Sequence, residues 1–293
     1  MDLIRSLMFI PGNRPKMLEK GLTLPADALV PDLEDSVPPE EKPNARAIVS
    51  EYLPKLADKR VFVRVNGMQT GWTWDDLKAV VSRHIEGISI GKMESREMAL
   101  ELSGLLLVLE RERGLPEGHT KLIPWIETAK GVANVKEIAL STPRMLGLAF
   151  GAEDYTADMA IARTKDSEEI ATARAMTAIA ARAADIQCFD TPDPDYNDID
   201  SMVKDARRAK AVGCKGKFVI HPNQVGPVNE VFRPTTAEVD HARRVVAVFE
   251  EAKRKGSAAI ALDGKMVDTP VWKRALKLLE VADAIERREA ARR

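Results

Sequence analysis

The chain has 293 residues, of which 45% are hydrophobic and 30% are charged, so it carries enough apolar material for a globular core and does not resemble a disordered chain. Its 44 basic and 45 acidic residues nearly cancel, which argues against a general attraction to nucleic acid or to an anionic membrane. The two cysteines stand in no metal-binding pattern, the N-terminus lacks the features of a signal peptide, and no apolar run approaches the ~20 residues that span a bilayer, so we expect a reduced, cytoplasmic protein.

Eight short apolar or β-branched runs alternate along the chain with longer stretches of helical character. In chain order the runs are LMFI (7–10), ALVPDL (28–33), VFVRV (61–65), GISI (87–90), KLIPWI (121–126), MLGLAF (145–150), IQCF (186–189) and KFVI (217–220). The intervening stretches carry helix signals, such as Ser95 as an N-cap before Met98. Eight strand–helix repeats favour a closed (β/α)₈ barrel, or TIM barrel, over an open sheet.

A further segment follows the eighth run. We expect a helix over about 236–255, with one apolar face, that ends at Gly256. The stretch AIALDGKMVDTP (259–270) and a last charged helix continue beyond it. The sequence therefore predicts a barrel over residues 1–232 and a C-terminal helical extension over 233–293.

Polar residues follow the runs, at the strand ends where barrel enzymes place their chemistry. In strand order they are Asn13 and Arg14, Glu34 and Asp35, Arg64 and Asn66, Lys92 and Glu94, Glu127 and Thr128, Glu153 and Asp154, Asp190 and Thr191, and His221 and Asn223. Any one of them alone is better explained as a solvated charge or a helix N-cap. Together, carboxylates crowded on one rim repel one another unless they share a cation, and a few oxygen ligands suit Mg²⁺. Zinc is disfavoured because the four histidines form no clustered pattern.

Ordered motifs extend over nearly the whole chain. They are RSLMFIPGNRPKMLEKG, DALVPDLEDSVPPEEKPNAR, FVRVNG, IGKMES, PWIETAKGV, LAFGAEDYTADM, IHPNQV and ALDGKMVDTPVWKRA, from about residue 5 to about residue 280. In this order they resemble the citrate lyase β-subunit-like family of the HpcH/HpaI aldolase superfamily, which includes citryl-, malyl- and citramalyl-CoA lyases. The resemblance implies a (β/α)₈ barrel with a C-terminal extension, a homotrimer or hexamer, and Mg²⁺ as cofactor, with Mn²⁺ able to replace it.

The same resemblance implies a reaction and the residues that perform it. The reaction is cleavage of a β-hydroxyacyl thioester, carried by CoA or by an acyl-carrier protein, into an acetyl or acyl thioester and a keto acid, or the reverse Claisen-type condensation. Glu127 and Asp154 would be the metal ligands, and Arg64 the cation beside the reacting carbonyl. Asp268 would be the acid/base, supplied by the extension of a neighbouring subunit. Without the resemblance, Asp268 is best explained as a helix N-cap, because Asp-Thr-Pro is a good helix start.

The densest acidic cluster, VPDLEDSVPPEEK (30–42), then supports the metal site instead of forming it. Glu34 and Asp35 are expected to accept hydrogen bonds from metal-bound water or to orient Arg64. Arg5 and Lys16 are candidates for binding the CoA phosphates, and Arg5 is the better of the two. Solvation of exposed side chains is the competing explanation for both basic residues.

Two other functions stay open on the sequence. The chain could be the β subunit of a citrate lyase complex that acts on a carrier-bound citryl thioester, or a non-catalytic barrel that binds small molecules. An aldolase for free keto acids is less favoured, because the GKMVD segment belongs to the thioester branch of the family. A phosphosugar enzyme is disfavoured, because TPDPDYND and HPNQVGP contain no glycine-rich phosphate cradle.

Overall fold

The computed structural model describes residues 3–256 and 259–291 and divides into two compact units. One unit is Ile4–Val231, and the other is Phe232–Arg293 together with Leu3. None of the described helices combines the length and the apolar character needed to cross a membrane.

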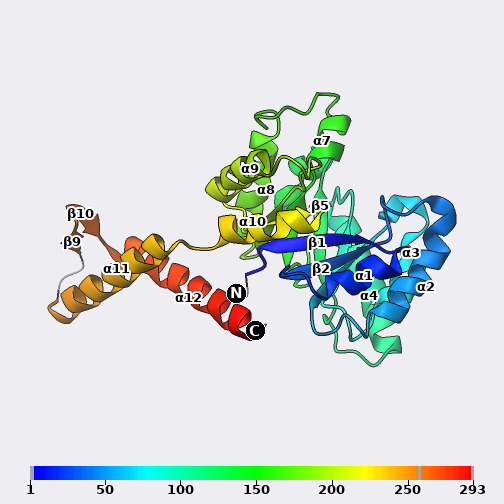
Figure 1. Ribbon diagram of the computed structural model, residues 1–293, viewed down its shortest axis with the longest axis horizontal. Coiled ribbons are helices and arrows are strands. Elements are labelled where there is room, and N and C mark those ends of the chain that lie inside the picture. The colour runs from blue at the N-terminus through cyan, green and yellow to red at the C-terminus, as the bar shows by residue number, and fades with distance from the viewer. Residues whose placement is uncertain (1–2, 257–258, 292–293) are drawn as a thin grey trace. The chain divides into compact units, whose positions relative to one another are not determined.

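Eight parallel strands close into a barrel in the unit Ile4–Val231 (Figure 1). They are β1 (Ser6–Pro11), β2 (Ala28–Asp32), β3 (Arg60–Val65), β4 (Gly87–Ile90), β5 (Lys121–Ile126), β6 (Gly147–Phe150), β7 (Gln187–Asp190) and β8 (Gly216–Val219). Each strand pairs with its neighbour in sequence, and β1 also pairs with β8, so the sheet has no free edge. The eight predicted runs are all strands, and the predicted (β/α)₈ barrel is confirmed.

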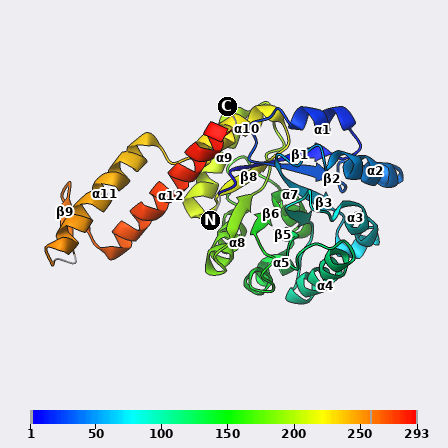
Figure 2. The same cartoon turned by 90° about the horizontal axis from the view of Figure 1, so that it is seen from below.

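Helices surround these strands, as Figure 2 shows. They are α1 (Pro15–Gly21), α2 (Lys42–Tyr52), α3 (Thr73–Val80), α4 (Arg96–Glu112), α5 (Ala129–Ala133), α6 (Val135–Ala139), α7 (Ala152–Asp158), α8 (Ala171–Ala183), α9 (Ile199–Val212) and α10 (Pro222–Phe232), with the 3₁₀ turns η1 (Pro39–Glu41) and η2 (Met68–Thr70). The predicted N-cap at Ser95 is confirmed, because its hydroxyl accepts a hydrogen bond from the backbone N–H of Met98.

Alternate strand residues fill the barrel interior. This core contains Ile4, Leu7, Phe9, Ala28, Val30, Phe62, Ile123, Trp125, Ala149, Phe189 and Phe218. The rings of Phe9, Trp125 and Phe218 contact one another, with centroids 4.5–5.8 Å apart. Because side chains alternate between the two faces of a strand, the next inward position of each strand lies one layer closer to the strand's carboxyl end. The aromatic layer is therefore the floor of any site at that end.

The C-terminal unit is a pair of helices joined by a β-hairpin (Figure 1). Its elements are α11 (Thr236–Arg254), β9 (Ile260–Leu262), β10 (Lys265–Val267) and α12 (Thr269–Ala291). The helix predicted over 236–255 is confirmed as α11, which begins with a capping box between Thr235 and Glu238. The prediction of a purely helical extension omitted the hairpin. Its two turn residues are Asp263 and Gly264, and both have positive φ. The dipeptide Asp-Gly is a common sequence signal for a two-residue hairpin turn.

Candidate active site

Charged residues occupy the carboxyl ends of three strands above the aromatic floor. Arg64 on β3 lies two residues after the core residue Phe62, and Asp32 at the end of β2 lies two residues after Val30. Glu127 follows β5 at the same interval from Trp125. Strand periodicity therefore directs all three side chains to the inner side of the barrel, where the core composition changes from apolar to charged.

The guanidinium of Arg64 is held by the acidic loop after β2. Its Nε and one terminal nitrogen donate to the two carboxylate oxygens of Asp32, both at 2.6 Å, and its other terminal nitrogen lies 3.1 Å from both Glu34 and Asp35. The guanidinium carbon stands 4.5 Å from the centroid of the Phe9 ring. Burial opposes ionisation of Asp32, but the charge and hydrogen bonds of Arg64 outweigh it and hold the pKa of that carboxyl below its usual range. Burial raises the pKa of Glu34 to about 7, against the opposing charge of Arg64.

Glu127 is also a buried carboxylate, with only 7% of the residue exposed. Its Oε1 accepts a hydrogen bond of 2.7 Å from the backbone N–H of Lys92. Burial, together with the negative charges of Asp154 and Glu34, raises the pKa of Glu127 to about 8. A carboxylate in this situation gains strongly from a cation placed beside it.

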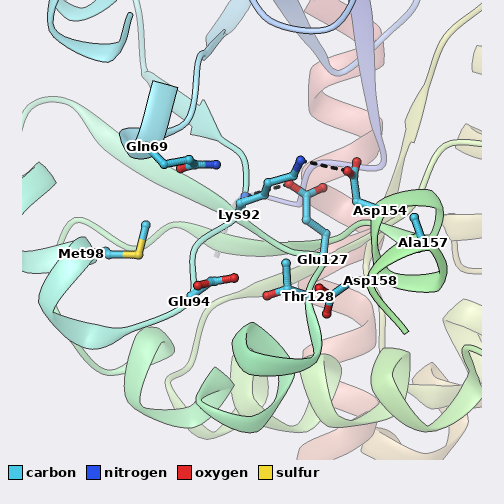
Figure 3. A pocket seen from close by; sticks show the side chains of 9 residues that line it. All are labelled: Gln69, Lys92, Glu94, Met98, Glu127, Thr128, Asp154, Ala157 and Asp158. Atoms are coloured by element: carbon cyan, nitrogen blue, oxygen red, sulfur yellow. Dashed lines mark hydrogen bonds and ion pairs between the residues drawn. The ribbon is translucent and has the colours of Figure 1, made fainter. Parts of the chain in front are cut away.

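Asp154, in the first turn of α7, completes the acidic group and carries a cationic partner. The Nζ of Lys92 lies 3.2 Å from its Oδ1, and Figure 3 shows the lysine side chain extended over Glu127 toward Asp154. Lys92 adopts a left-handed backbone conformation, with φ of 52°. These groups line a pocket of about 530 Å³, whose walls are formed by Gln69, Lys92, Glu94, Met98, Glu127, Thr128, Asp154, Ala157 and Asp158.

Two glycines keep the space beside Glu127 free of side chains. A Cβ on Gly91 would lie 2.9 Å from Glu127 Oε1 and 3.0 Å from Glu34 Oε1. A Cβ on Gly151 would lie 2.7 Å from the Cβ of Glu127. The two glycines therefore maintain an open cradle that is lined by carboxylate oxygens.

The donor set of this cradle fits Mg²⁺. Two carboxylates, Glu127 and Asp154, leave coordination positions for water and for substrate oxygens, which is the usual arrangement for this ion. Among the residues that the structure describes, no three His, Cys, Asp or Glu side chains are arranged to enclose a metal by themselves. The ammonium of Lys92 already lies beside Asp154 as a cationic partner. The site thus suits a metal that shares its ligands with a substrate.

Arg5, predicted to bind CoA phosphates, lies elsewhere. It precedes β1, at the amino end of the barrel, and only 1% of the residue is exposed. Its Nε, one terminal nitrogen and its backbone N–H all donate to the carboxylate of Asp27, at 2.8–3.0 Å. This prediction was wrong, because a residue before a strand faces the opposite end of the barrel from one after it, and because this guanidinium is committed to a buried ion pair.

Lys16 is exposed in the first turn of α1, directly after β1, and so lies on the carboxyl side of the barrel. The N-cap of α1 is Arg14, and no side chain caps the helix. Asn13, just before it, does not cap the helix, and its side-chain amide donates to Glu41. Pro15 at the first helical position fixes the start of the helix without a capping side chain.

Two other strand-end residues do not join the acidic group. Asp190 alternates with the core residue Phe189 and points outward, where it accepts a 2.6 Å hydrogen bond from the buried ammonium of Lys217. His221 stacks on Tyr196 with ring centroids 4.8 Å apart, and its Nδ1 lies 2.6 Å from Asn223 Oδ1. Asp190 is thus held by ion pairs on the outer side of the barrel, with Lys217 on β8 and Arg174 on α8, and His221 by contacts between the loops that follow β7 and β8.

Asp268 lies in the C-terminal unit, between β10 and α12. Its Oδ1 accepts a hydrogen bond of 3.1 Å from the backbone N–H of Val271, which is the geometry of a helix N-cap. The alternative explanation of Asp268, that it is the N-cap of a helix, is therefore confirmed. The cap uses one of the two carboxylate oxygens.

Two residues of the site were absent from the sequence-based candidates. Asp32 is the principal partner of Arg64, and the signal for it was its alternation with Ala28 and Val30 along β2. Lys92 was noted at a strand end but not proposed as a site residue, because nothing in the sequence indicates that its backbone N–H holds Glu127.

Comparisons with known proteins agree with this arrangement. The family model described as HpcH/HpaI aldolase/citrate lyase matches residues 5–222. The chain is 40% identical over 284 residues to the citrate lyase subunit beta of Leuconostoc mesenteroides subsp. cremoris, covering 96% of this chain and 94% of that protein. It is 31% identical over 294 residues to the mitochondrial citramalyl-CoA lyase of Mus musculus, covering 96% and 87%. Among solved structures, CitE from Mycobacterium tuberculosis in complex with magnesium, acetoacetate and coenzyme A aligns with a TM-score of 0.78 and 28% identity, covering 96% of this chain and 98% of that one.

Proposed function

The chain belongs to the HpcH/HpaI aldolase/citrate lyase family, and from that premise we propose that it is a Mg²⁺-dependent carbon–carbon lyase. Its substrate is a β-hydroxyacyl-CoA thioester such as citramalyl-CoA, malyl-CoA or a citryl thioester. The reaction yields acetyl-CoA and a keto acid, or forms the same bond in the reverse, Claisen-type direction.

One observation carries this proposal: buried Glu127 and half-buried Asp154 line the same pocket, beside a cradle that two glycines keep open, while Arg64 stands at the carboxyl end of β3 in the same barrel. Carboxylates with a free cradle between them suit a Mg²⁺ ion, which when bound would polarise the keto acid oxygens and orient them. A fixed guanidinium nearby suits the negative charge that develops on the substrate. The solved relative from M. tuberculosis, which contains magnesium, acetoacetate and coenzyme A, supports the assignment.

Each residue of the chain has a separate task in this proposal. Glu127 and Asp154 would hold the metal. Arg64, kept in place by Asp32, would stabilise the negative oxygen of the enolate or alkoxide, and one such preorganised donor is typically worth about 3–4 kcal/mol of barrier. Glu34 and Asp35 both contact Arg64, and we propose that they orient it.

The thioester needs an acid/base that acts on the carbon next to its carbonyl. We assign this role to Asp268, which would return a proton to that carbon during cleavage and remove one during condensation. We further propose that the C-terminal unit supplies Asp268 to the barrel of a neighbouring subunit in a homotrimer or hexamer. The exposed Lys16 on the carboxyl side of the barrel is the remaining candidate for a CoA phosphate contact.

The role of Asp268 can be separated from metal binding. Asp268→Asn keeps an oxygen that can cap α12 but cannot accept a proton, so we expect turnover to be lost while Mg²⁺ affinity and the unfolding midpoint stay close to wild type. Normal turnover by this variant would refute the assignment. Mixing Asp268→Asn with Glu127→Gln subunits should restore part of the activity if the residue acts across subunits.

The reaction itself is tested with a substrate panel. Purified protein is incubated with malyl-CoA, (R)- and (S)-citramalyl-CoA and citryl-CoA, with Mg²⁺ or with EDTA, and keto acid release is followed. We expect turnover of at least one thioester that requires the metal and is absent in Glu127→Gln. Absence of metal-dependent turnover of all of them would refute a stand-alone lyase.

A second candidate function is favoured by the 40% identity to a citrate lyase subunit beta. In that case the substrate would be a citryl thioester on an acyl-carrier protein, and the free CoA thioesters would be poor substrates. Replacing CoA by a phosphopantetheinyl carrier domain in the same assay distinguishes the two. A cytoplasmic location also belongs to the proposal, supported by two cysteines that are both buried free thiols.

A further inference from the structure

A buried lysine holds the acidic loop that follows β2. Lys42, the first residue of α2, is 6% exposed, and its Nζ donates hydrogen bonds of 2.9 Å to the carbonyl of Leu33 and 3.1 Å to the carbonyl of Glu34. Within the described chain the partners of this ammonium are these two backbone carbonyls. Burying a charge without a charged partner is costly, so the arrangement needs a reason beyond packing.

The same segment is held from the other side by β3. The carbonyl of Leu33 also accepts a 2.9 Å hydrogen bond from the side-chain amide of Asn66, and the N–H of Leu33 donates to the carbonyl of Arg64 at 2.9 Å. Asn66 is in turn fixed by the fully buried carboxylate of Asp76, which accepts from its amide at 2.6 Å and from its N–H at 2.9 Å. Leu33 is thus fixed at every backbone polar group. Lys42 also donates to the carbonyl of Glu34, which in addition accepts a 3.1 Å hydrogen bond from the N–H of Val37.

The restraint acts against electrostatic repulsion. The Oε1 atoms of Glu34 and Glu127 both lie close to the point that a Cβ on Gly91 would occupy, so two carboxylates face the same small space. Like charges at this separation push apart, and a loop that is free to move would carry Glu34 outward. A loop whose carbonyls are fixed by an ammonium cannot relax in this way.

We propose that Lys42 is a positioning residue of the active site: by holding the carbonyls of Leu33 and Glu34, it keeps the Glu34 carboxylate between Glu127 and Arg64. Glu34 there adds negative charge beside the metal cradle and a third carboxylate contact to Arg64. The inference rests on the proposed metal site and deepens it, because it assigns the metal affinity partly to a residue that touches neither metal nor substrate.

The test compares lysine-to-carbonyl contacts at opposite ends of β2, of which only that of Lys42 is made by a buried residue. Lys42→Met removes the ammonium at the carboxyl end, and Lys59→Met removes a similar contact at the amino end, where Lys59 Nζ donates to the carbonyl of Leu24 at 3.1 Å. Mg²⁺ affinity is measured by titration calorimetry without substrate, and thermal unfolding reports the fold. We expect Lys42→Met to weaken Mg²⁺ binding at least tenfold and to lower kcat with less than a threefold change in the thioester KM. Lys59→Met should leave both unchanged.

A double-mutant cycle separates positioning from general destabilisation. If Lys42 acts through Glu34, the effect of Lys42→Met on Mg²⁺ affinity should disappear in a Glu34→Gln background, whereas a purely structural effect would persist there. Lys42→Gln, which keeps one amide donor, takes the place of Lys42→Met if that variant does not fold. Wild-type Mg²⁺ affinity in the Lys42 variant, or equal losses in the Lys42 and Lys59 variants, would overturn the inference. A wild-type protein without lyase activity whose Mg²⁺ affinity still depends on Lys42 would refute the proposed reaction and leave the inference standing.

Discussion

The pair formed by Arg64 and Asp32 gives the most quantitative prediction about the site. Asp32→Asn keeps the shape of the side chain but removes its charge, while Arg64 stays largely buried, with 14% of its side chain exposed. Removing one partner of a buried ion pair typically costs 3–5 kcal/mol. Arg64 retains Glu34 and Asp35 at 3.1 Å, so we expect the lower end of this range, about 3 kcal/mol of unfolding free energy.

The assay is equilibrium unfolding in urea, with Asp35→Asn as the matched control. Asp35 contacts the same guanidinium but has 70% of its side chain exposed, so its removal should cost less than about 1 kcal/mol. Because Arg64 would lose its fixed orientation, turnover by Asp32→Asn should also fall, by roughly 10- to 100-fold. An Asp32 variant no less stable than the Asp35 variant would refute the reasoning.

The same pair also predicts a pH dependence with a definite sign. The pKa of Asp32 is lowered in the folded protein, so its contribution to stability is present above the unfolded pKa of about 4 and is lost as the pH falls through the lower folded value. The stability difference between wild type and Asp32→Asn should therefore be constant above about pH 5 and shrink on further acidification. A difference that stays constant down to pH 2.5 would contradict the assigned ion pair.

Two further predictions concern the metal cradle. Gly91→Ala would place a methyl group 2.9 Å from a Glu127 oxygen, so the Mg²⁺ affinity measured by calorimetry should fall at least tenfold. The control is Gly104→Ala on α4, where a Cβ would meet nothing within 4 Å, and it should leave the Mg²⁺ affinity unchanged. Lys92→Met removes the ammonium group that pairs with Asp154, and this ammonium would repel a bound cation. Mg²⁺ binding should therefore tighten about two- to fivefold, which corresponds to the free energy of an exposed ion pair. Unchanged affinity in Gly91→Ala, or weaker binding in Lys92→Met, would show that the cradle is not where the metal binds.

The barrel, and the position of the candidate site residues at its strand ends, were predictable because they depend on local patterns. Each apolar run was long enough to be read as a strand, and eight strand–helix repeats close in one common way. Residues after a strand in such a barrel gather on one side, which is why Arg64, Glu127 and Glu34 lie near one another, whereas the roles proposed for Arg64 and Glu127 came from the family resemblance. The same rule explains why the prediction for Arg5 was wrong. Arg5 precedes β1 and so lies at the amino end of the barrel, opposite the candidate site.

The remaining features depend on contacts that local patterns do not contain. The hydrogen bond from the Lys92 backbone to Glu127 joins residues 35 positions apart through a left-handed conformation that a lysine seldom adopts. The bonds from Lys42 to two carbonyls likewise require the loop after β2 to fold back onto α2. The hairpin β9–β10 is different, because its Asp263-Gly264 turn was present in the sequence as a recognised signal and was overlooked.

The acidic segment 30–42 shows how charge is divided at this end of the barrel. It is the densest acidic stretch of the chain. Asp32, Glu34 and Asp35 nevertheless all form ion pairs with Arg64, so this one guanidinium balances part of their negative charge. Glu127 and Asp154, from more distant parts of the sequence, line the pocket beside it. A guanidinium surrounded by three carboxylates cannot move toward the proposed metal ligands and neutralise them, and this keeps Arg64 separate from the proposed metal site. The density of acidic residues in the sequence therefore does not mark the proposed metal site, because the carboxylates of the densest cluster contact Arg64.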